Sequence, residues 1–324
     1  EGCAEFYRYE DADAEDSAVP PGHDLTHTPA HPNCPACRTG KMKKAPATGT
    51  EPDEAEKGEE PYEKVSADLF HCRNADVYGN HFYLSTIDHY TKWPRGAPLP
   101  NKTPDVVWEP FVVLFPGNRF ESIERLRAFP AVIRTDEGTE WWGAFKTGAV
   151  QRGATMEKSI PRRSESNSIA EREVQEVQQS MRAALVKSGA PLSFWAFAVR
   201  HQSYNRARAT PVENTDTAYA MQFQTDFVGN LGPFGCACTF HYQGEEKQDK
   251  LEARGCAGAV LGYGTGGSFQ CLDLETFADE RRVKIVVSKN VQVDRSTFPL
   301  QALCTDDERN GVDGFELQHA GDPT

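Results

Sequence analysis

The chain has 324 residues, nine cysteines and a formal net charge of −13. No apolar run approaches the roughly 18 residues that a membrane-spanning helix requires, and no secretory signal peptide is visible, so the membrane and secreted classes are not expected. The cysteines are odd in number and scattered, which is unlike a disulfide framework and is typical of a reducing compartment. The sequence starts with Glu1 and has no initiator methionine, so we expect a fragment of a longer product.

The negative charge is concentrated at the two ends of the chain. Residues 1–60 carry a net charge of −8 and residues 301–324 a net charge of −5, which leaves 28 acidic and 28 basic side chains between them. This balance excludes a strongly basic DNA-binding domain, although a neutral core can still present one basic face. Composition and pattern predict six parts: an acidic tail (1–19), a segment rich in histidine and cysteine (20–45), an acidic linker (46–60), a mixed α/β core (61–212), a small β-domain (213–300) and a second acidic tail (301–324).

The core alternates between strand and helix patterns. Thr103 and Pro104 are suited to be the N-cap and first residue of a helix. A long helix is expected over 169–187, because its apolar residues recur in steps of three and four, and Gly189 ends it. The remaining expected elements are strands at 64–70, 82–88, 97–99, 129–135 and 154–160, and a helix at 192–206.

The composition of the sequence changes after about residue 215. Glycines become frequent, and short β-prone runs follow one another at 236–242, 257–263, 268–274 and 283–294. Runs of this length and spacing predict a small β-domain or barrel.

Three carboxylates suggest a metal site. Asp136 follows a short apolar run and precedes a glycine loop, Asp68 stands near the end of the first strand, and Glu171 lies in the first turn of the long helix. Two aspartates at the ends of neighbouring strands, with a glutamate brought over them by a helix, would offer oxygen ligands to two divalent cations for phosphodiester chemistry.

Each of these carboxylates also has a plainer interpretation. Aspartate is common at strand ends because it favours turns. Ser168 and Glu171 match the Ser-x-x-Glu pattern of a capping box. Glu173 and Glu176 are alternative acidic residues on the same helix.

Several stretches of residues 61–208 resemble a known family. They are Ala-Asp-Leu-Phe (67–70), Tyr-Leu-Ser-Thr-Ile-Asp-His-Tyr-Thr-Lys-Trp (83–93), Arg-Thr-Asp-Glu-Gly-Thr-Glu-Trp (134–141), Ser-Asn-Ser-Ile-Ala-Glu-Arg (166–172), Leu-Ser-Phe-Trp (192–195) and Tyr-Asn-Arg (204–206). In this order they resemble the catalytic core of retroviral-type integrases, and most closely the copia-type retrotransposon integrase of a Gag-Pol polyprotein. The resemblance implies an RNase H-like fold and a catalytic Asp-Asp-Glu triad of Asp68, Asp136 and Glu171, which would bind Mg²⁺ or Mn²⁺.

The resemblance extends to both flanks of the core. Cys34-Pro35-Ala36-Cys37, followed by Gly40-Lys41, resembles the Cys-x-x-Cys edge of the family's zinc-binding segment, and four nitrogen or sulfur ligands hold Zn²⁺ tetrahedrally. We expect His27, Cys34 and Cys37 as ligands, with His23, or alternatively His31, as the fourth; the other interpretation is a loop without metal. Segments of 234–299 resemble the small β-barrel that follows the core in copia-type polyproteins.

The resemblance implies DNA 3′-end processing and strand transfer by an oligomer on element ends and target DNA, with no membrane partner. Such a protein would act in the nucleus and otherwise reside in a cytoplasmic particle. The alternative is a catalytically inactive, transposon-derived module for nucleic-acid binding or assembly, suggested by Glu137, where the family has asparagine, and by a shortened gap before Glu171. Candidate nucleic-acid contacts, which would position a phosphate backbone without reading its sequence, are Lys92, Lys102, Arg162, Arg163, Arg172, Gln175 and Arg182.

Overall fold

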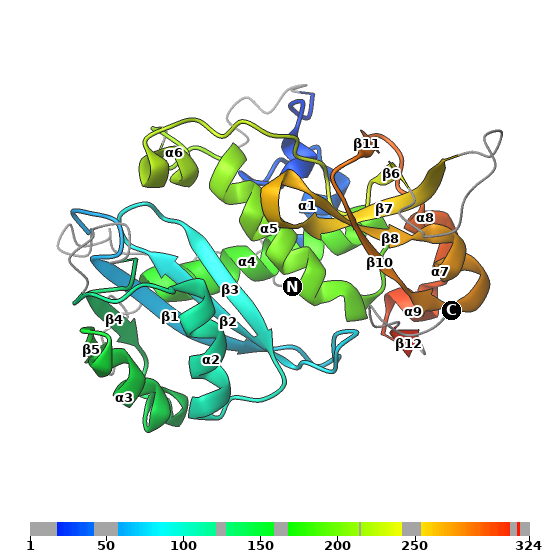
Figure 1. The fold of residues 1–324 in the computed structure, drawn as a ribbon. Helices are drawn as coiled ribbons and strands as arrows, with labels where there is room; N and C mark the ends of the chain where they lie inside the picture. Colours follow the sequence, from blue (N-terminus) through cyan, green and yellow to red (C-terminus); the bar gives the residue numbers. More distant parts are fainter. Residues whose placement is uncertain are drawn as a thin grey trace, which may run out of the picture.

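The computed structural model describes residues 18–41, 58–120, 128–158, 168–213, 215–241, 254–311 and 316–317. Two five-stranded sheets lie on either side of a central pair of helices, α4 and α5 (Figure 1). No helix in the described part of the chain is both long and apolar enough to cross a membrane. Most of the first predicted tail and of the linker lies outside the described residues.

The first sheet has the strand order β3-β2-β1-β4-β5. β1 pairs antiparallel with β2, and β2 with β3, whereas β4 runs parallel to β1 and β5 parallel to β4. This combination of three antiparallel strands followed by two parallel ones is the RNase H-like arrangement, so the expected fold is confirmed. The strands are β1 (Lys64–His71), β2 (Phe82–Asp88), β3 (Pro94–Leu99), β4 (Val132–Thr135) and β5 (Thr155–Lys158).

Helices cover both faces of this sheet. Successive side chains of a strand point to opposite faces, so Val65 and Ala67 pack with α2 (Pro104–Leu114) and α3 (Ala144–Gln151), while Phe70 packs with α4 (Ser168–Ser188) and α5 (Trp195–Ala209). Asp68 has the same parity as Phe70. Its side chain therefore belongs to the face that α4 covers.

The predicted apolar stripe of the long helix is confirmed. Ala170, Val177, Met181 and Leu185 are all at most 8% exposed, and Val174 packs against the same core. The helix ends at Ser188, one residue before Gly189, whose backbone φ is +70°. A left-handed residue directly after a helix is the usual place for glycine.

The second sheet has the strand order β10-β8-β7-β6-β11 and is antiparallel throughout. Its two edge strands are consecutive in the chain and are separated only by residues 289 and 290. The sheet must therefore curl until its edges approach each other, which agrees with the expected barrel-like domain. The strands are β6 (Ala237–His241), β7 (Gly255–Tyr263), β8 (Phe269–Asp273), β10 (Ile285–Ser288) and β11 (Val291–Asp294).

Several elements differ from those expected. The predicted run 283–294 is divided into β10 and β11 by a turn, and β4 begins three residues later than expected. β1 continues past Asp68 to His71, although its parallel pairing with β4 ends at Ser66. Several elements were not predicted. They are α3, η1 (His23–Leu25), α1 (Pro35–Gly40), η4 (Thr139–Trp141), α6 (Ala218–Phe223), η6 (Thr265–Gly267), α7 (Leu274–Glu280), β9 (Arg282–Val283), α8 (Leu300–Leu303), α9 (Asp306–Arg309) and β12 (Glu316–Leu317). The start of the predicted 192–206 helix is a separate turn, η5 (Leu192–Phe194).

Candidate metal centres

The pairing of β1 with β4 aligns two of the three predicted carboxylates. Val65 pairs with Ile133, and Ser66 with Arg134. Continued by two residues, this parallel register places Asp68 opposite Asp136, on the same face of the sheet. Asp136 directly follows the last residue of β4, so its side chain stands where that strand leaves the sheet.

One oxygen of each aspartate is already held in place. The backbone N–H of Leu69 donates to Asp68 Oδ1 over 2.7 Å. The indole Nε1 of Trp141 donates to Asp136 Oδ1 over 2.5 Å, and the backbone N–H of Gly138 donates to the same oxygen over 3.1 Å. Among the described residues neither Oδ2 atom has a hydrogen-bond partner, so each aspartate has one oxygen left for a cation.

The structure separates the three acidic residues of α4 by role. Glu173 is 5% exposed and accepts a hydrogen bond from Arg206 Nη2 at Oε2 over 2.6 Å. Glu176 Oε1 lies 2.7 Å from the Nζ atom of Lys41. Both alternatives to Glu171 are thus occupied in ion pairs, whereas Glu171 is exposed in the first turn of the helix.

The electrostatics of Asp68 connect these carboxylates. Burial raises the pKa of Asp68 to about 6, against one opposing hydrogen bond from the Leu69 backbone, and the negative charges of Asp136, Glu171 and Glu140 raise it further. Asp136, Glu171 and Glu140 are therefore within electrostatic reach of Asp68. A cation is the countercharge that such a set of hard oxygen ligands would accept.

The three carboxylates do not form a closed ligand set. Among the described residues, only His23, His27, Cys34 and Cys37 bring their ligand atoms close enough together to hold a metal ion. Asp136, Glu171 and Glu140 act on Asp68 through their charges, but the carboxylate oxygens are not gathered as closely as the ligand atoms of the histidine and cysteine cluster.

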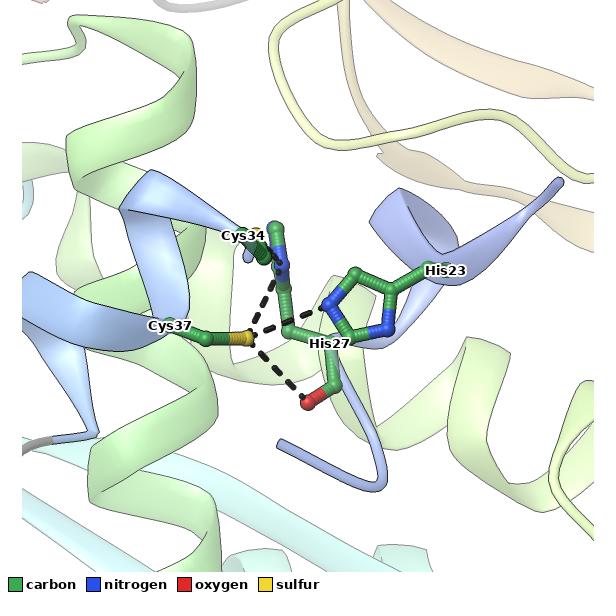
Figure 2. A group of neighbouring side chains, drawn as sticks. All are labelled: His23, His27, Cys34 and Cys37. Atoms are coloured by element: carbon green, nitrogen blue, oxygen red, sulfur yellow. Dashed lines mark hydrogen bonds between the residues drawn. The ribbon is translucent and has the colours of Figure 1, made fainter. Parts of the chain in front are cut away.

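The histidine and cysteine cluster is compact. Figure 2 shows His23, His27 and Cys37 directed toward one another, with Cys34 beside them. Their ligand atoms all lie within 4.8 Å of one another; His23 Nε2 is 3.2 Å from Cys37 Sγ, and His27 Nδ1 is 3.6 Å from both sulfur atoms. Separations of this size suit four ligands placed about 2.0 to 2.3 Å from one tetrahedral Zn²⁺.

The protonation states of His27 and Cys37 both bear on metal binding. Burial lowers the pKa of His27 to about 3, with the charges of His23 and Lys41 contributing, so its ring is neutral and offers a lone pair. Burial raises the pKa of the Cys37 thiol, and thiolate formation would accompany zinc binding. Of the two candidates for the fourth ligand, the structure places His23 in the group, while His31 accepts the Asn33 backbone N–H at Nδ1 over 3.2 Å.

The described members of the predicted nucleic-acid contacts have different surroundings. Arg172 and Gln175 are exposed on α4, and Lys102 Nζ lies 4.0 Å from Glu140 Oε1 beside the aspartates. Arg182 is exposed, but its Nε donates to the Gly40 carbonyl over 3.1 Å and so links α4 to α1. Lys92 occupies the β2–β3 turn with φ +54°. Arg162, Arg163 and the Ser168 side chain lie outside the described residues.

Three residues of these sites were not predicted. The indole of Trp141 holds Asp136, buried Glu140 adds a fourth carboxylate, and Lys41 ties the zinc segment to α4. Trp141 and Glu140 lie within the motif that carried the resemblance, and Lys41 follows Gly40 in the zinc segment. Their proximity to the motifs was the available signal, but the contacts depend on how the loops fold.

No protein-family model matches the chain. The Retrovirus-related Pol polyprotein from transposon RE2 of Arabidopsis thaliana is 24% identical over 273 residues, 82% of this chain and 17% of that protein. The corresponding polyprotein from transposon TNT 1-94 of Nicotiana tabacum is 24% identical over 241 residues, 72% of this chain and again 17% of the relative. The homologues of this chain are thus retrovirus-related Pol polyproteins of plant transposons, and the chain spans about a sixth of their length.

Solved structures that resemble the chain are retroviral integrases. The catalytic core domain of BIV integrase has a TM-score of 0.39 at 12% identity and covers 50% of this chain and 95% of its own. The HTLV-2 integrase catalytic core domain in complex with magnesium has a TM-score of 0.40 at 12% identity, over 51% of this chain and 99% of its own. A simian T-cell lymphotropic virus intasome in complex with PP2A regulatory subunit B56 gamma has a TM-score of 0.40 at 9% identity, over 74% and 84%.

Proposed function

Because its homologues are Pol polyproteins of transposons, we propose that this chain is an integrase segment that catalyses metal-dependent 3′-end processing and strand transfer of DNA. The observation that supports this most strongly is the parallel register of β1 and β4, which pairs Ser66 with Arg134 and, extended by two residues, would bring Asp68 opposite Asp136. The raised pKa of Asp68 supports it as well, because burial and three neighbouring carboxylates concentrate negative charge that a bound cation would offset.

In this proposal Asp68, Asp136 and Glu171 hold Mg²⁺ or Mn²⁺. The bound cations would supply Lewis acidity to the attacking oxygen and to the leaving oxygen of a phosphodiester. Asp136 is kept in position by Trp141 and Gly138 at Oδ1, and Oδ2 would be the oxygen that binds the cation. Glu171, exposed at the start of α4, would complete the ligand set from the helix.

DNA is the proposed substrate, both as element ends and as target, and the working form is an oligomer on DNA. Arg172 and Gln175 present donors on the exposed face of α4, and Lys102 adds one beside Glu140. These side chains would contact phosphates and so position the duplex without reading its sequence. Zn²⁺ at the His23 cluster would fix the segment that packs against α4.

The test is a strand-transfer assay on labelled oligonucleotides with Mg²⁺. The double variant Asp136→Asn/Glu171→Gln should lose activity by about a hundredfold or more, because two metal ligands are removed. Glu275→Gln is the matched control, since Glu275 is exposed on α7, which packs on the second sheet, and it should retain activity. Undiminished activity in the double variant would refute the mechanism.

The second candidate is a catalytically inactive module that binds nucleic acid. It is favoured by the separation of the three carboxylates, which do not reach the closeness of the His23 cluster. Wild-type chain that binds duplex DNA but shows no Mg²⁺- or Mn²⁺-dependent nicking would support it.

A further inference from the structure

A cavity of about 90 Å³ lies between α5 and the second sheet, and none of the residues proposed to bind metal lines it. Phe197, Arg200, His201 and Tyr204 line it from α5, at the spacing of one helical face. Tyr263 of β7 and Gln270 of β8 are on the opposite wall. A single buried water needs about 10 to 15 Å³ of such volume, so the cavity has room for a small polyatomic ligand.

His201 makes this cavity chemically unusual. Its side chain is 1% exposed, and neither ring nitrogen has a hydrogen-bond partner of good geometry. Burial lowers its pKa to about 3, a shift that the nearby Gly232 backbone opposes in part, so the ring is neutral. A neutral imidazole carries one N–H donor, and buried polar groups in folded proteins are nearly always satisfied by protein, water or ligand.

The charges around the cavity are of one sign. Arg200 is exposed at the cavity and forms no ion pair with any described carboxylate, and no aspartate or glutamate is among the lining residues. The Gln270 amide, which also lines the cavity, forms no hydrogen bond within the described part of the chain. One unpaired guanidinium and two neutral donors therefore border a space without a negative group.

The aromatic walls make this arrangement rigid. The Tyr204 and Tyr263 rings are stacked at 4.2 Å, and the His201 and Tyr263 rings at 5.1 Å. The Arg208 guanidinium lies 3.4 Å from the centre of the Tyr204 ring. With these faces already covered, the cavity offers ring edges and polar atoms, which favours a compact polar ligand over a planar base.

We propose that this cavity binds a phosphate group, with Arg200 supplying the charge and the His201 N–H and the Gln270 amide donating to its oxygens. Hydrogen bonds from a guanidinium to phosphate are among the stronger polar contacts in proteins. The group could belong to free inorganic phosphate or to a nucleic-acid backbone, and both have the same oxygens. The site uses none of the residues proposed for catalysis, so it stands or fails independently of the integrase function.

The experiment follows the His201 imidazole by NMR in the full chain with labelled histidine. Inorganic phosphate is titrated at constant ionic strength, with chloride as the balancing anion, and the His201 signal is assigned from its loss in His201→Phe. We expect a saturable shift of that signal with phosphate. Arg200→Gln should weaken binding about tenfold or more, because a charged hydrogen bond is lost, and the fold should persist because Arg200 is exposed.

Arg254→Gln is the matched control, since Arg254 is exposed in the same part of the molecule and does not line the cavity, and its affinity should equal that of the wild type. A short single-stranded oligonucleotide is the second arm. If it displaces phosphate, the ligand is a backbone phosphodiester; if it leaves the bound signal unchanged, the ligand is the free ion. Absence of a saturable shift, or equal affinity in the Arg200→Gln variant, would overturn the proposal.

Discussion

At the scale of a single residue, the ionised form of Asp68 is unfavourable in the metal-free fold but suited to binding a cation. The fold buries it on the face that α4 covers, and the site surrounds it with the charges of Asp136, Glu171 and Glu140. Both effects oppose ionisation, and only the backbone N–H of Leu69 favours it. Such a residue weakens the metal-free fold at neutral pH and becomes favourable once a cation is bound.

We therefore expect Asp68→Asn to stabilise the metal-free chain at pH 7. A folded-state pKa of about 6, raised above the ordinary 3.8, gives stability that is complete below pH 3.8 and is lost as the pH rises through 6. Urea unfolding without added divalent ions should show the wild type losing about 2 to 3 kcal/mol relative to the variant between pH 4 and pH 7. Asp279→Asn, at an exposed position, should leave the wild-type slope unchanged. Parallel curves for the wild type and Asp68→Asn would contradict this.

The sequence could identify the two aspartates, because strand patterns and a motif mark their positions. The predicted strand at 64–70 matches β1 to within one residue, but the sequence could not predict that its parallel pairing with β4 ends at Ser66 while its pairing with β2 continues. Nor could it predict the bond from Trp141 to Asp136, because the reach of an indole depends on the short turn η4 between them.

At the scale of elements, α4 connects the zinc segment, the sheet and the proposed active site. α1 packs so closely on it that a side chain at Gly40 would meet the backbone of Ala183, with a Cβ atom only 2.6 Å from its nitrogen. Lys41, whose side chain is 2% exposed, forms an ion pair with Glu176, which lies on α4 seven residues before Ala183. The Thr28 hydroxyl donates to the same carboxylate over 2.8 Å. The position of Glu171 is thus tied to the folding of the zinc segment.

Glu176→Gln should loosen this attachment. Burial alone would raise the pKa of Glu176, but Lys41, Arg206 and the Thr28 hydroxyl outweigh it and hold the pKa at about 2. A lowered pKa gives stability that is present above pH 4.5 and is lost as the pH falls toward 2. We expect the variant to lose about 2 to 3 kcal/mol at pH 7, with Lys41 left buried and unpaired.

Urea unfolding of the zinc-loaded protein measures this loss, and the rate of zinc release to a chelator should rise with it. The difference from the wild type should shrink below pH 4.5, because Glu176 takes up a proton there in the unfolded chain but stays ionised in the folded protein until the pH nears 2. Glu171→Gln, exposed on the same helix, is the control and should change stability by less than about 0.5 kcal/mol. A variant as stable as the wild type at pH 7 would show that the ion pair does not hold the segment.

Periodicity explains which elements were predictable. α4 shows a regular stripe over 21 residues and was placed to within one residue at each end. α3 is short and contains Gly148, which lowers its helix propensity. The Trp108 ring occupies the space that a Cβ atom at Gly148 would need, so α3 is held by close packing that the sequence pattern does not show. β10 and β11 read as one apolar run, and the division follows from pairing with opposite edges of the sheet.

At the scale of the whole molecule, α4 and α5 pack against both sheets, and the side chains between them form one shared core. The largest described cluster of buried side chains contains Phe70 and Tyr83 of the first sheet, Phe194 beside α5, and Leu261 and Leu272 of the second sheet. The sequence predicted a boundary near residue 213 from the change in composition. Composition marks where strand patterns begin, but it cannot show that the helix before the boundary is buried on both sides.

A shared core predicts that a cavity in the second sheet will destabilise the first. All five tryptophans lie between Trp93 and Trp195, so their fluorescence reports on the α/β core alone. Leu272, in β8, is fully buried in the shared cluster, and Leu272→Ala should cost about 3 kcal/mol because it leaves a cavity. If the molecule unfolds as one unit, Leu272→Ala will lower the urea midpoint of the tryptophan transition, and the free energy of unfolding obtained from it will fall by about 3 kcal/mol. Val287→Ala, at a half-exposed position of β10, will leave the midpoint unchanged. A tryptophan transition unmoved by Leu272→Ala would mean that the two sheets unfold separately and that the packing of α5 against β7 contributes little to the stability of the core.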